Sequence, residues 1–377
     1  MKHCLALIIG LFAGLSSVAA QEVTLLFAGD AMQHQSQIDN AFRGGKYDYA
    51  SYFQYVSAEV AAADVAVVNL EVTLGGKPYK GYPQFSAPDE YALALKDAGF
   101  DVFLNANNHI VDRANSGILR TLTVLDSMHV AHTGAFRNRE EWEQTYPLIV
   151  ETEGIKLAML NYTYGTNGNV AREPVFVNYI DTLQIRQDVQ KARNQGADVI
   201  VANMHWGTEY KLLPNRAQEA VADFLVAEGV ELIIGGHPHV VQPSKAIVDS
   251  AGNITNIVVY SLGNFVSGMT AANTYGGQML KIVLKKAWNT TSIQSAEYAL
   301  IYRHKAPARN RNNKIDFAVV PVSLAEKTDS MPPAIHLDAE SERKMLLFSK
   351  TARAIFDEHN VQIPEYKIPN PVEINAL

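Results

Sequence analysis

Short apolar runs alternate with amphipathic segments along most of the chain. The apolar runs, which are typical of buried strands, cover residues 23–28, 64–70, 101–104, 198–203 and 230–234. Apolar side chains at helical spacing, which predict helices, occur in residues 88–98, 116–128, 182–194, 214–228 and 340–359. A β-rich region is expected at 254–285. This alternation predicts an α/β fold.

Acidic, amide and imidazole side chains follow directly after the five predicted strands. In open α/β sheets, ligands bind where the carboxyl ends of the strands converge, so we expect these side chains to form one pocket. The candidates are Asp30, Glu71, Asn108, His109, His205, His237 and His239. Carboxylate and amide oxygens combined with imidazole nitrogens suit a divalent metal ion such as Mn, Fe or Zn.

Each candidate alone also has an ordinary structural explanation. Asp30 could cap a helix or turn, His109 could be a core histidine, and His205 could serve packing. Residues 235–239 (Gly-Gly-His-Pro-His) have no obvious packing purpose, because the glycines allow the backbone to approach closely beside two histidines. The occurrence of all five clusters in one chain therefore favours a metal site.

Composition and charge narrow the classes of function. The chain has 377 residues, 47% of them hydrophobic and 19% charged, which excludes a disordered protein. It carries 32 Lys and Arg against 39 Asp and Glu, a formal net charge of -7, so no nucleic-acid partner is expected. Cys4 is the only cysteine of the sequence, which excludes a zinc site built from thiolates.

The N-terminus has the three-part pattern of a secretory signal peptide. A basic start at residues 1–3 precedes the uncharged apolar run 4–15, and small residues then lead to Ala20. A membrane anchor is the alternative, but a bilayer core needs about 20 apolar residues and this run is shorter. We therefore expect cleavage after Ala20 and export to the periplasm or the exterior.

Six motifs, in order and with characteristic spacing, resemble the CapA family of poly-γ-glutamate capsule synthesis proteins. They are Gly29-Asp30, Asn69-Leu70-Glu71, Asn107-Asn108-His109 with Asp112, His205-Trp206-Gly207 with Glu209-Tyr210, Gly236-His237-Pro238-His239 with Gln242, and Ser261-Leu262-Gly263-Asn264-Phe265. The resemblance covers residues 23–284. That family is similar to the calcineurin-like metallophosphoesterases, which implies a four-layer α/β/β/α sandwich with two metals at the strand ends.

The resemblance also implies a domain organisation and residue roles. A signal peptide at 1–20 would precede a CapA-like domain at 21–303, and an extension at 304–377 would pack its late helix on that domain. The implied ligands of one metal are Glu71, Asn108, His205 and His237, and those of the other are Asp30, Glu71 and His239. His109 would act as a general acid held by Asp112. The implied substrate contacts are Glu209, Tyr210 and Asn264.

The chain departs from the phosphoesterase pattern in the first motif. Met32 stands where those enzymes have a histidine, and a thioether is a poor ligand for these metals. His34 lies two residues further and is a possible substitute. Glu71 replaces the usual aspartate of the second motif. One of the two metal sites is therefore expected to be weak or empty.

Two functions stay open at this point. The first is a metal-dependent hydrolase that cleaves a phosphoester or an amide bond of an anionic polymer. The second is a non-catalytic, polymer-binding partner of membrane-bound capsule synthesis proteins. The long Gly- and Asn-rich segment 161–174 suits a lid over the site, with a connection between the sheets as the alternative.

Overall fold

The structure is a computed structural model that describes residues 21–305, 317–327 and 333–369. The predicted signal peptide at 1–20 lies outside these residues. No helix within the described ranges has the length and apolar character needed to cross a bilayer.

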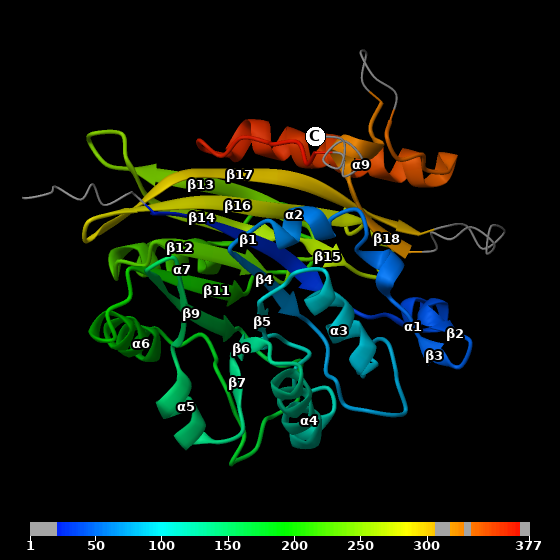
Figure 1. Ribbon diagram of the computed structural model, residues 1–377, viewed down its shortest axis with the longest axis horizontal. Helices are drawn as coiled ribbons and strands as arrows, with labels where there is room; N and C mark the ends of the chain where they lie inside the picture. Colours follow the sequence, from blue (N-terminus) through cyan, green and yellow to red (C-terminus); the bar gives the residue numbers. More distant parts are fainter. Residues whose placement is uncertain (1–20, 306–316, 328–332, 370–377) are drawn as a thin grey trace, which may run out of the picture.

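Fourteen strands of the described chain form one hydrogen-bonded network (Figure 1). Its main path runs through β6 (Ala131–Thr133), β5 (Val102–Leu104), β4 (Val65–Leu70), β1 (Gln21–Ala31), β16 (Gly276–Ala287), β17 (Thr290–Lys305), β14 (Ile254–Leu262), β12 (Leu232–Gly236), β11 (Val199–His205), β9 (Ile155–Thr163) and β8 (Leu148–Thr152). Three further strands pair beside this path, namely β13 (Val241–Val248) with β14, β15 (Asn264–Val266) with β1, and β18 (Phe317–Pro321) with β17. Two small ribbons pair β2 (Phe42–Arg43) with β3 (Lys46–Tyr47) and β7 (Ala135–Phe136) with β10 (Phe176–Val177).

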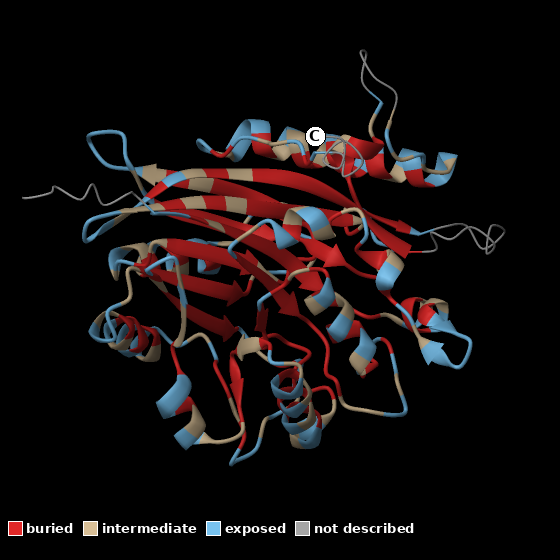
Figure 2. Cartoon of the chain, viewed as in Figure 1, coloured by how far each residue is buried: buried red, intermediate tan, exposed pale blue. Residues whose placement is uncertain are grey.

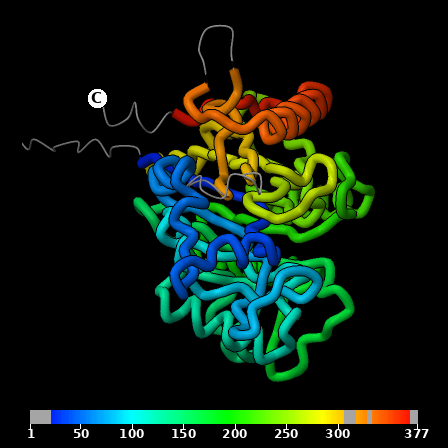
Figure 3. Tube along the Cα trace, turned by 90° about the vertical axis from the view of Figure 1, so that its right-hand side faces the viewer, coloured from blue at the N-terminus to red at the C-terminus, as the bar shows by residue number. Residues whose placement is uncertain are grey.

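The helices cover both outer faces of this network. α9 (Ala339–His359) lies along β13 and β17 on one side, and the other long helices lie on the opposite side, beneath β4, β5, β9 and β11 (Figure 1). The long helices on that side are α3 (Asp89–Asp97), α4 (Ala114–Ser127), α6 (Thr182–Asn194) and α7 (Arg216–Ala227). Figure 3 likewise places α9 and α4 at opposite ends of the molecule. The predicted α/β/β/α order of layers is therefore confirmed.

Apolar burial holds the layers together. The largest buried cluster of the described chain joins side chains of β1, β12, β16 and α9, among them Leu25, Leu232, Leu280 and Phe348. A second cluster packs α6 and α7 against β9, β11 and β12. Figure 2 shows the strands as almost continuously buried, while the helices expose their outer faces. This burial pattern explains why the central strands read as unbroken apolar runs.

Side-chain caps mark the N-termini of three of the long helices. The side chains of Asp181, Asn215 and Asp338 accept hydrogen bonds from the first-turn backbone of α6, α7 and α9. Such side chains satisfy amide groups that have no partner inside the helix. The short helices are α1 (Gln35–Ala41), α2 (Ser57–Ala61), α5 (Arg139–Thr145) and α8 (Val322–Ala325), with a 3₁₀ turn at Ala50–Tyr52.

The chain after α9 returns to the sheet. Val361 pairs with β13, where its amide donates to the Ser244 carbonyl at 3.0 Å and its carbonyl accepts from Ala246 at 2.9 Å. The Tyr366 amide donates to the Tyr298 carbonyl of β17 at 2.8 Å. β17 itself runs through residue 303 to Lys305. The division into a domain at 21–303 and an extension at 304–377 stays a prediction.

Candidate metal centre

The carboxyl end of β1 places Asp30 between two neighbouring strands. Asp30 pairs in register with Asn69 of β4 and with Asn264 of β15, and β1 has an irregularity at this point. A β-carbon on Gly29 would lie 1.9 Å from the Gly263 carbonyl oxygen, so this position requires glycine. The close approach of the two backbones therefore fixes where the Asp30 side chain begins.

Hydrogen bonds hold both carboxylate oxygens of the fully buried Asp30. Asn69 Nδ2 donates to Oδ1 at 2.8 Å, and the His237 amide donates to Oδ2 at 3.1 Å. His239 Nδ1 lies 3.3 Å from the same Oδ2. Burial raises the pKa of Asp30, but the bond to His239 and the nearby His205 outweigh it and hold the pKa below its usual range. Asp30 is thus an anion fixed in one orientation.

Glu71 lies beside this anion with no comparable support. Its carboxylate is fully buried, and neither oxygen has a hydrogen-bond partner among the described residues. Oε1 lies 3.7 Å from His205 Nε2 and 3.8 Å from His239 Nε2. Burial and the neighbouring Asp30 raise the pKa of Glu71 well above its usual range. A buried carboxylate is normally paired or bound to a metal.

The donor atoms around Glu71 fit a divalent metal. Glu71, His205 and His237 form one group whose ligand atoms lie within 4.8 Å of one another, and Asp30, Glu71 and His239 form a second. Nδ1 of the buried His237 also lacks a partner among the described residues. Burial lowers the pKa of His205 to about 3, so its imidazole is neutral, the form that binds metals. The structure therefore brings five of the six predicted ligands into two overlapping groups.

The sixth predicted ligand, Asn108, lies against His205. Its Oδ1 is 2.8 Å from His205 Nε2, and its Nδ2 donates to Asn167 Oδ1 at 3.2 Å. Asn167 belongs to the segment 161–174, and in the same segment the Tyr164 ring lies 4.5 Å from the His237 ring. The segment therefore contacts the centre, whereas its action as a lid stays a prediction.

His109 and Asp112 form a buried pair next to the cluster. His109 Nδ1 lies 2.8 Å from Asp112 Oδ2, which also accepts a hydrogen bond from the Phe85 amide at 2.8 Å. The Phe85 ring meets the imidazole edge-on at 4.6 Å. With Nδ1 facing the carboxylate, Nε2 is the nitrogen left for proton exchange.

The backbone of the turn that carries His237 and His239 is strained at both histidines. Both histidines have positive φ angles, 95° and 58°. A β-carbon on Gly236 would lie 2.8 Å from Asp30 Oδ1. Such backbone conformations are costly for residues other than glycine and cluster at functional sites. The close approach explains the glycine at position 236, and the strained backbone of the two histidines points to a functional need for their imidazoles.

The three predicted substrate contacts occupy different surroundings. Glu209 is partly exposed and forms a third ligand group with His237 and His239. Tyr210 is 47% exposed beside His239. Asn264 is fully buried, with Oδ1 3.1 Å from His239 Nδ1 and Nδ2 donating to the His239 carbonyl at 3.3 Å. Asn264 therefore positions His239, and substrate binding by all three residues stays a prediction.

Comparison with known protein families agrees with this arrangement. The family model described as bacterial capsule synthesis protein PGA_cap matches residues 24–269, which include every predicted ligand. This chain belongs to the PGA_cap family. The resemblance noted in the motifs is thereby confirmed.

Two relatives from Bacillus species share less than 30% sequence identity with this chain. The capsule biosynthesis protein CapA of Bacillus anthracis is 29% identical over 260 residues, which cover 65% of this chain and 60% of the relative. The PGA biosynthesis protein CapA of Bacillus subtilis (strain 168) is 27% identical over 253 residues, covering 63% and 62%. The PGA_cap chain thus matches about three fifths of the length of these curated relatives.

Solved structures with a similar backbone fold include a nucleotidase and a phosphoesterase. The NAD nucleotidase of Haemophilus influenzae has a TM-score of 0.47 at 14% identity, covering 89% of this chain and 61% of that chain. The calcineurin-like phosphoesterase YfkN of Bacillus subtilis has a TM-score of 0.43 at 13% identity, covering 89% and 99%.

Met32 stands where phosphoesterases have a histidine, and in this PGA_cap protein its side chain packs in the core. Met32 is 1% exposed and belongs to an apolar cluster. His34 Nδ1 accepts a hydrogen bond from the Gly268 amide at 3.1 Å, and its ring meets Phe85 edge-on. His34 is in none of the ligand groups found within the described ranges. The structure therefore gives no support to His34 as a substitute ligand.

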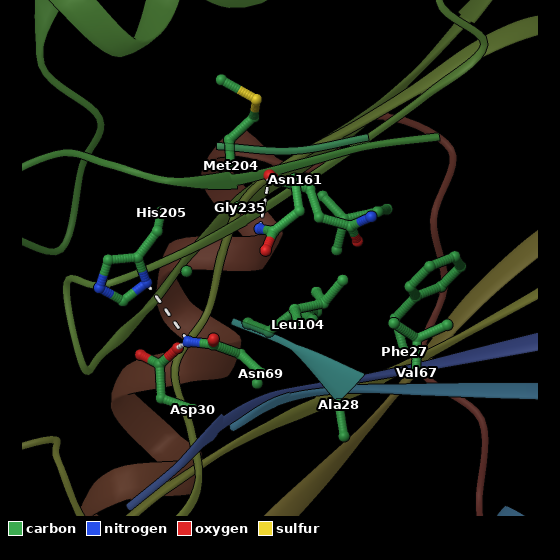
Figure 4. Close-up of a pocket in the computed structure, with 15 residues that line it drawn as sticks. Phe27, Ala28, Asp30, Val67, Asn69, Leu104, Asn161, Met204, His205 and Gly235 are labelled. Carbon is green, nitrogen blue, oxygen red and sulfur yellow. Dashed lines mark hydrogen bonds between the residues drawn. The ribbon is translucent and has the colours of Figure 1, made fainter. Parts of the chain in front are cut away.

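The sequence-based prediction gave no individual role to a row of buried asparagines behind the ligands, although Asn69 and Asn107 belong to its motifs. Asn69 Nδ2, besides bonding Asp30, lies 3.3 Å from His205 Nδ1, and Asn69 Oδ1 accepts from Asn107 Nδ2 at 3.1 Å. Figure 4 shows Asp30, Asn69 and His205 pointing toward one another. Asn69, Asn161 and Asn203 each fall near the end of a buried strand and line a cavity of about 20 Å³, which is room for one water molecule.

Replacing Asn69 with alanine tests this support. Asn69→Ala removes the hydrogen bond to Asp30 Oδ1, so we expect the free energy of unfolding to fall by about 1–3 kcal/mol. Mn²⁺ affinity should fall by roughly 10–100-fold, as is typical when a partner of a ligand is lost. Urea unfolding and isothermal titration calorimetry measure the two effects. Asn194→Ala on the exposed end of α6 is the control, and equal Mn²⁺ affinity in both variants would contradict the role of Asn69.

Proposed function

We propose that this protein is an exported, metal-dependent hydrolase that cleaves a phosphoester or an amide bond of an anionic capsule polymer. One observation carries the proposal: the buried Glu71 carboxylate has no hydrogen-bond partner within the described ranges and faces His205 and His239. A divalent cation would compensate such a carboxylate and keep it ionised, against the raised pKa that burial and Asp30 give it. A divalent ion supplies a water nucleophile near neutral pH by lowering the pKa of that water.

The residues that would hold one or two such ions form a single ligand set. It comprises Asp30, Glu71, Asn108, His205, His237 and His239. Oxygen and imidazole donors are compatible with Mn, Fe or Zn. The ionised Asp30 and the neutral His205 need no change of protonation to act as ligands.

His109 is the proton donor in this proposal. Asp112 accepts the hydrogen bond from His109 Nδ1 and is itself held by the Phe85 amide. These contacts fix the tautomer and the orientation of the imidazole, and they leave Nε2 to protonate the departing group. The chain thus separates the residues that bind the ion from the residue that transfers a proton.

The biological setting is taken from the relatives. Their names assign one to capsule biosynthesis and the other to PGA biosynthesis. An anionic polymer is the substrate that this setting favours, with membrane-bound capsule synthesis proteins as partners. The basic, apolar and small-residue regions of residues 1–20 support export.

Replacing His205 with alanine tests the metal-dependent activity. His205→Ala removes a neutral imidazole from the ligand set, so we expect metal content to fall and hydrolysis of p-nitrophenyl phosphoesters to drop at least ~100-fold. Elemental analysis and the colorimetric assay measure both. His132→Ala is the matched control, since that histidine pairs with Asp126. A wild-type protein that is metal-free and inert would support the non-catalytic polymer-binding alternative instead.

The role of His109 is tested separately from metal binding. His109→Gln keeps the size of the side chain but removes the proton donor, so kcat should fall by roughly 10²–10⁴-fold. Metal content should equal that of the wild type, because His109 is outside the ligand set. An unchanged kcat would disprove the assignment, and a loss of metal would reassign His109 to the ligands.

Export gives a further expectation. In cells that produce the full chain, the exported protein should begin at Gln21, because Ala20 ends the small-residue region that signal peptidases cleave. N-terminal sequencing of the protein recovered outside the cytoplasm checks this. A protein that still begins at Met1 would disprove cleavage.

A further inference from the structure

A third group of side chains that could bind a metal includes one partly exposed residue, Glu209. The Glu209 carboxylate lies with the ring nitrogens of His237 and His239 in a group whose ligand atoms are all within 4.8 Å of one another. Both histidines are buried, whereas Glu209 is partly exposed. A carboxylate with two imidazoles is a common set of protein ligands for a divalent ion.

Two backbone hydrogen bonds fix Glu209 relative to the histidines. The Tyr210 amide donates to the Pro238 carbonyl at 2.8 Å, and the Trp206 amide donates to the Gly236 carbonyl at 3.1 Å. These bonds join the loop after β11 to the turn after β12 on both sides of Glu209. Tyr210 has a φ angle of 67°, a conformation that non-glycine residues rarely adopt. The loop is therefore held in a defined position beside the histidines.

An independent observation points to a ligand at this place. His237 Nδ1 is buried and has no hydrogen-bond partner among the described residues. Buried imidazole nitrogens are normally satisfied, and an exception calls for an explanation such as an ion. The Tyr164 ring lies 4.5 Å from the His237 ring at an interplanar angle of 43°.

The ligand count leaves room for Glu209. Glu71, His205 and His237 have Asn108 Oδ1 beside them as a further oxygen donor, whereas Asp30, Glu71 and His239 offer three donors. The strand that carries Asp30 adds none, because Met32 is packed in an apolar cluster. Zinc takes at least four ligands, of which one is a water or the substrate in catalytic sites, so a group of three protein donors leaves one or more positions open. Within the described ranges, Glu209 is the further carboxylate whose oxygen lies near His239.

We propose that Glu209 is a metal ligand, which completes the coordination beside His239 in place of a ligand at position 32. This inference rests on the metal centre of the proposed function. It differs from the sequence-based prediction that Glu209 contacts substrate. As a ligand, Glu209 contributes to metal affinity whether or not substrate is present.

Calorimetric titration of the full chain with Mn²⁺, after removal of bound metal with a chelator, tests the proposal. Glu209→Gln removes the negative charge and keeps the shape, so it should lose one ion or bind it at least tenfold more weakly. Glu219→Gln, on the exposed face of α7, makes the same change of charge and should bind as the wild type does. Glu209→Asp keeps a carboxylate and should fall between them. Thermal unfolding with EDTA should be equal in all four proteins.

Spectroscopy with Co²⁺ distinguishes a ligand from a nearby charge. If Glu209 binds the ion, the visible absorption of the Co²⁺ protein changes in Glu209→Gln but not in Glu219→Gln. Unchanged Mn²⁺ affinity and an unchanged Co²⁺ spectrum in Glu209→Gln would overturn the proposal, and a raised KM alone would return Glu209 to substrate binding. A wild-type protein that binds no Mn²⁺ would overturn the metal centre itself, and Glu209 with it.

Discussion

The burial of an unsupported carboxylate at Glu71 is the constraint on which the centre depends. The surrounding amides and amide side chains are committed to its neighbours: Asn69 and the His237 amide hold Asp30, and Asn264 holds His239. Glu71 receives none of them among the described contacts. A bare buried anion would destabilise the fold by several kcal/mol, and the raised pKa of Glu71 reflects this cost. A bound cation would remove the cost and favour the ionised carboxylate. The candidate ligands Asp30, His205, His237 and His239 all lie in groups with Glu71.

Backbone geometry does as much as side-chain chemistry to build this centre. β1 changes register at Gly29 and Asp30, and such irregularities redirect a side chain next to functional sites. On the opposite strand end, Gly236 allows Asp30 to approach the histidine turn. Two glycines, 207 positions apart in the chain, thus bring an aspartate and a pair of histidines together. Larger residues at either position would force the strand ends apart.

The sequence predicted the elements well because strand and helix patterns are local. The helix expected at 182–194 matches α6, and the helix expected at 340–359 begins one residue earlier, after the Asp338 cap. The strand expected at 23–28 extends to Gln21–Ala31, since Gln21 pairs with β16 and both Asp30 and Ala31 still pair with β4 past the irregularity. The residues that follow the predicted strands likewise allowed the carboxylate, amide and imidazole ligands to be predicted. The support by Asn69 and the position of Glu209 could not be predicted, because both arise from contacts between distant segments.

The segment after α9 pairs with the outer edge of β13, and this pairing has a consequence for the chain during its synthesis. β13 starts two residues after His239, and the described chain closes its free edge with Val361. An open strand edge is a template for pairing with other chains. During synthesis, this edge therefore stays open until Val361 has emerged. A chain cut before Val361 would present the strand that anchors the histidine turn to neighbouring molecules.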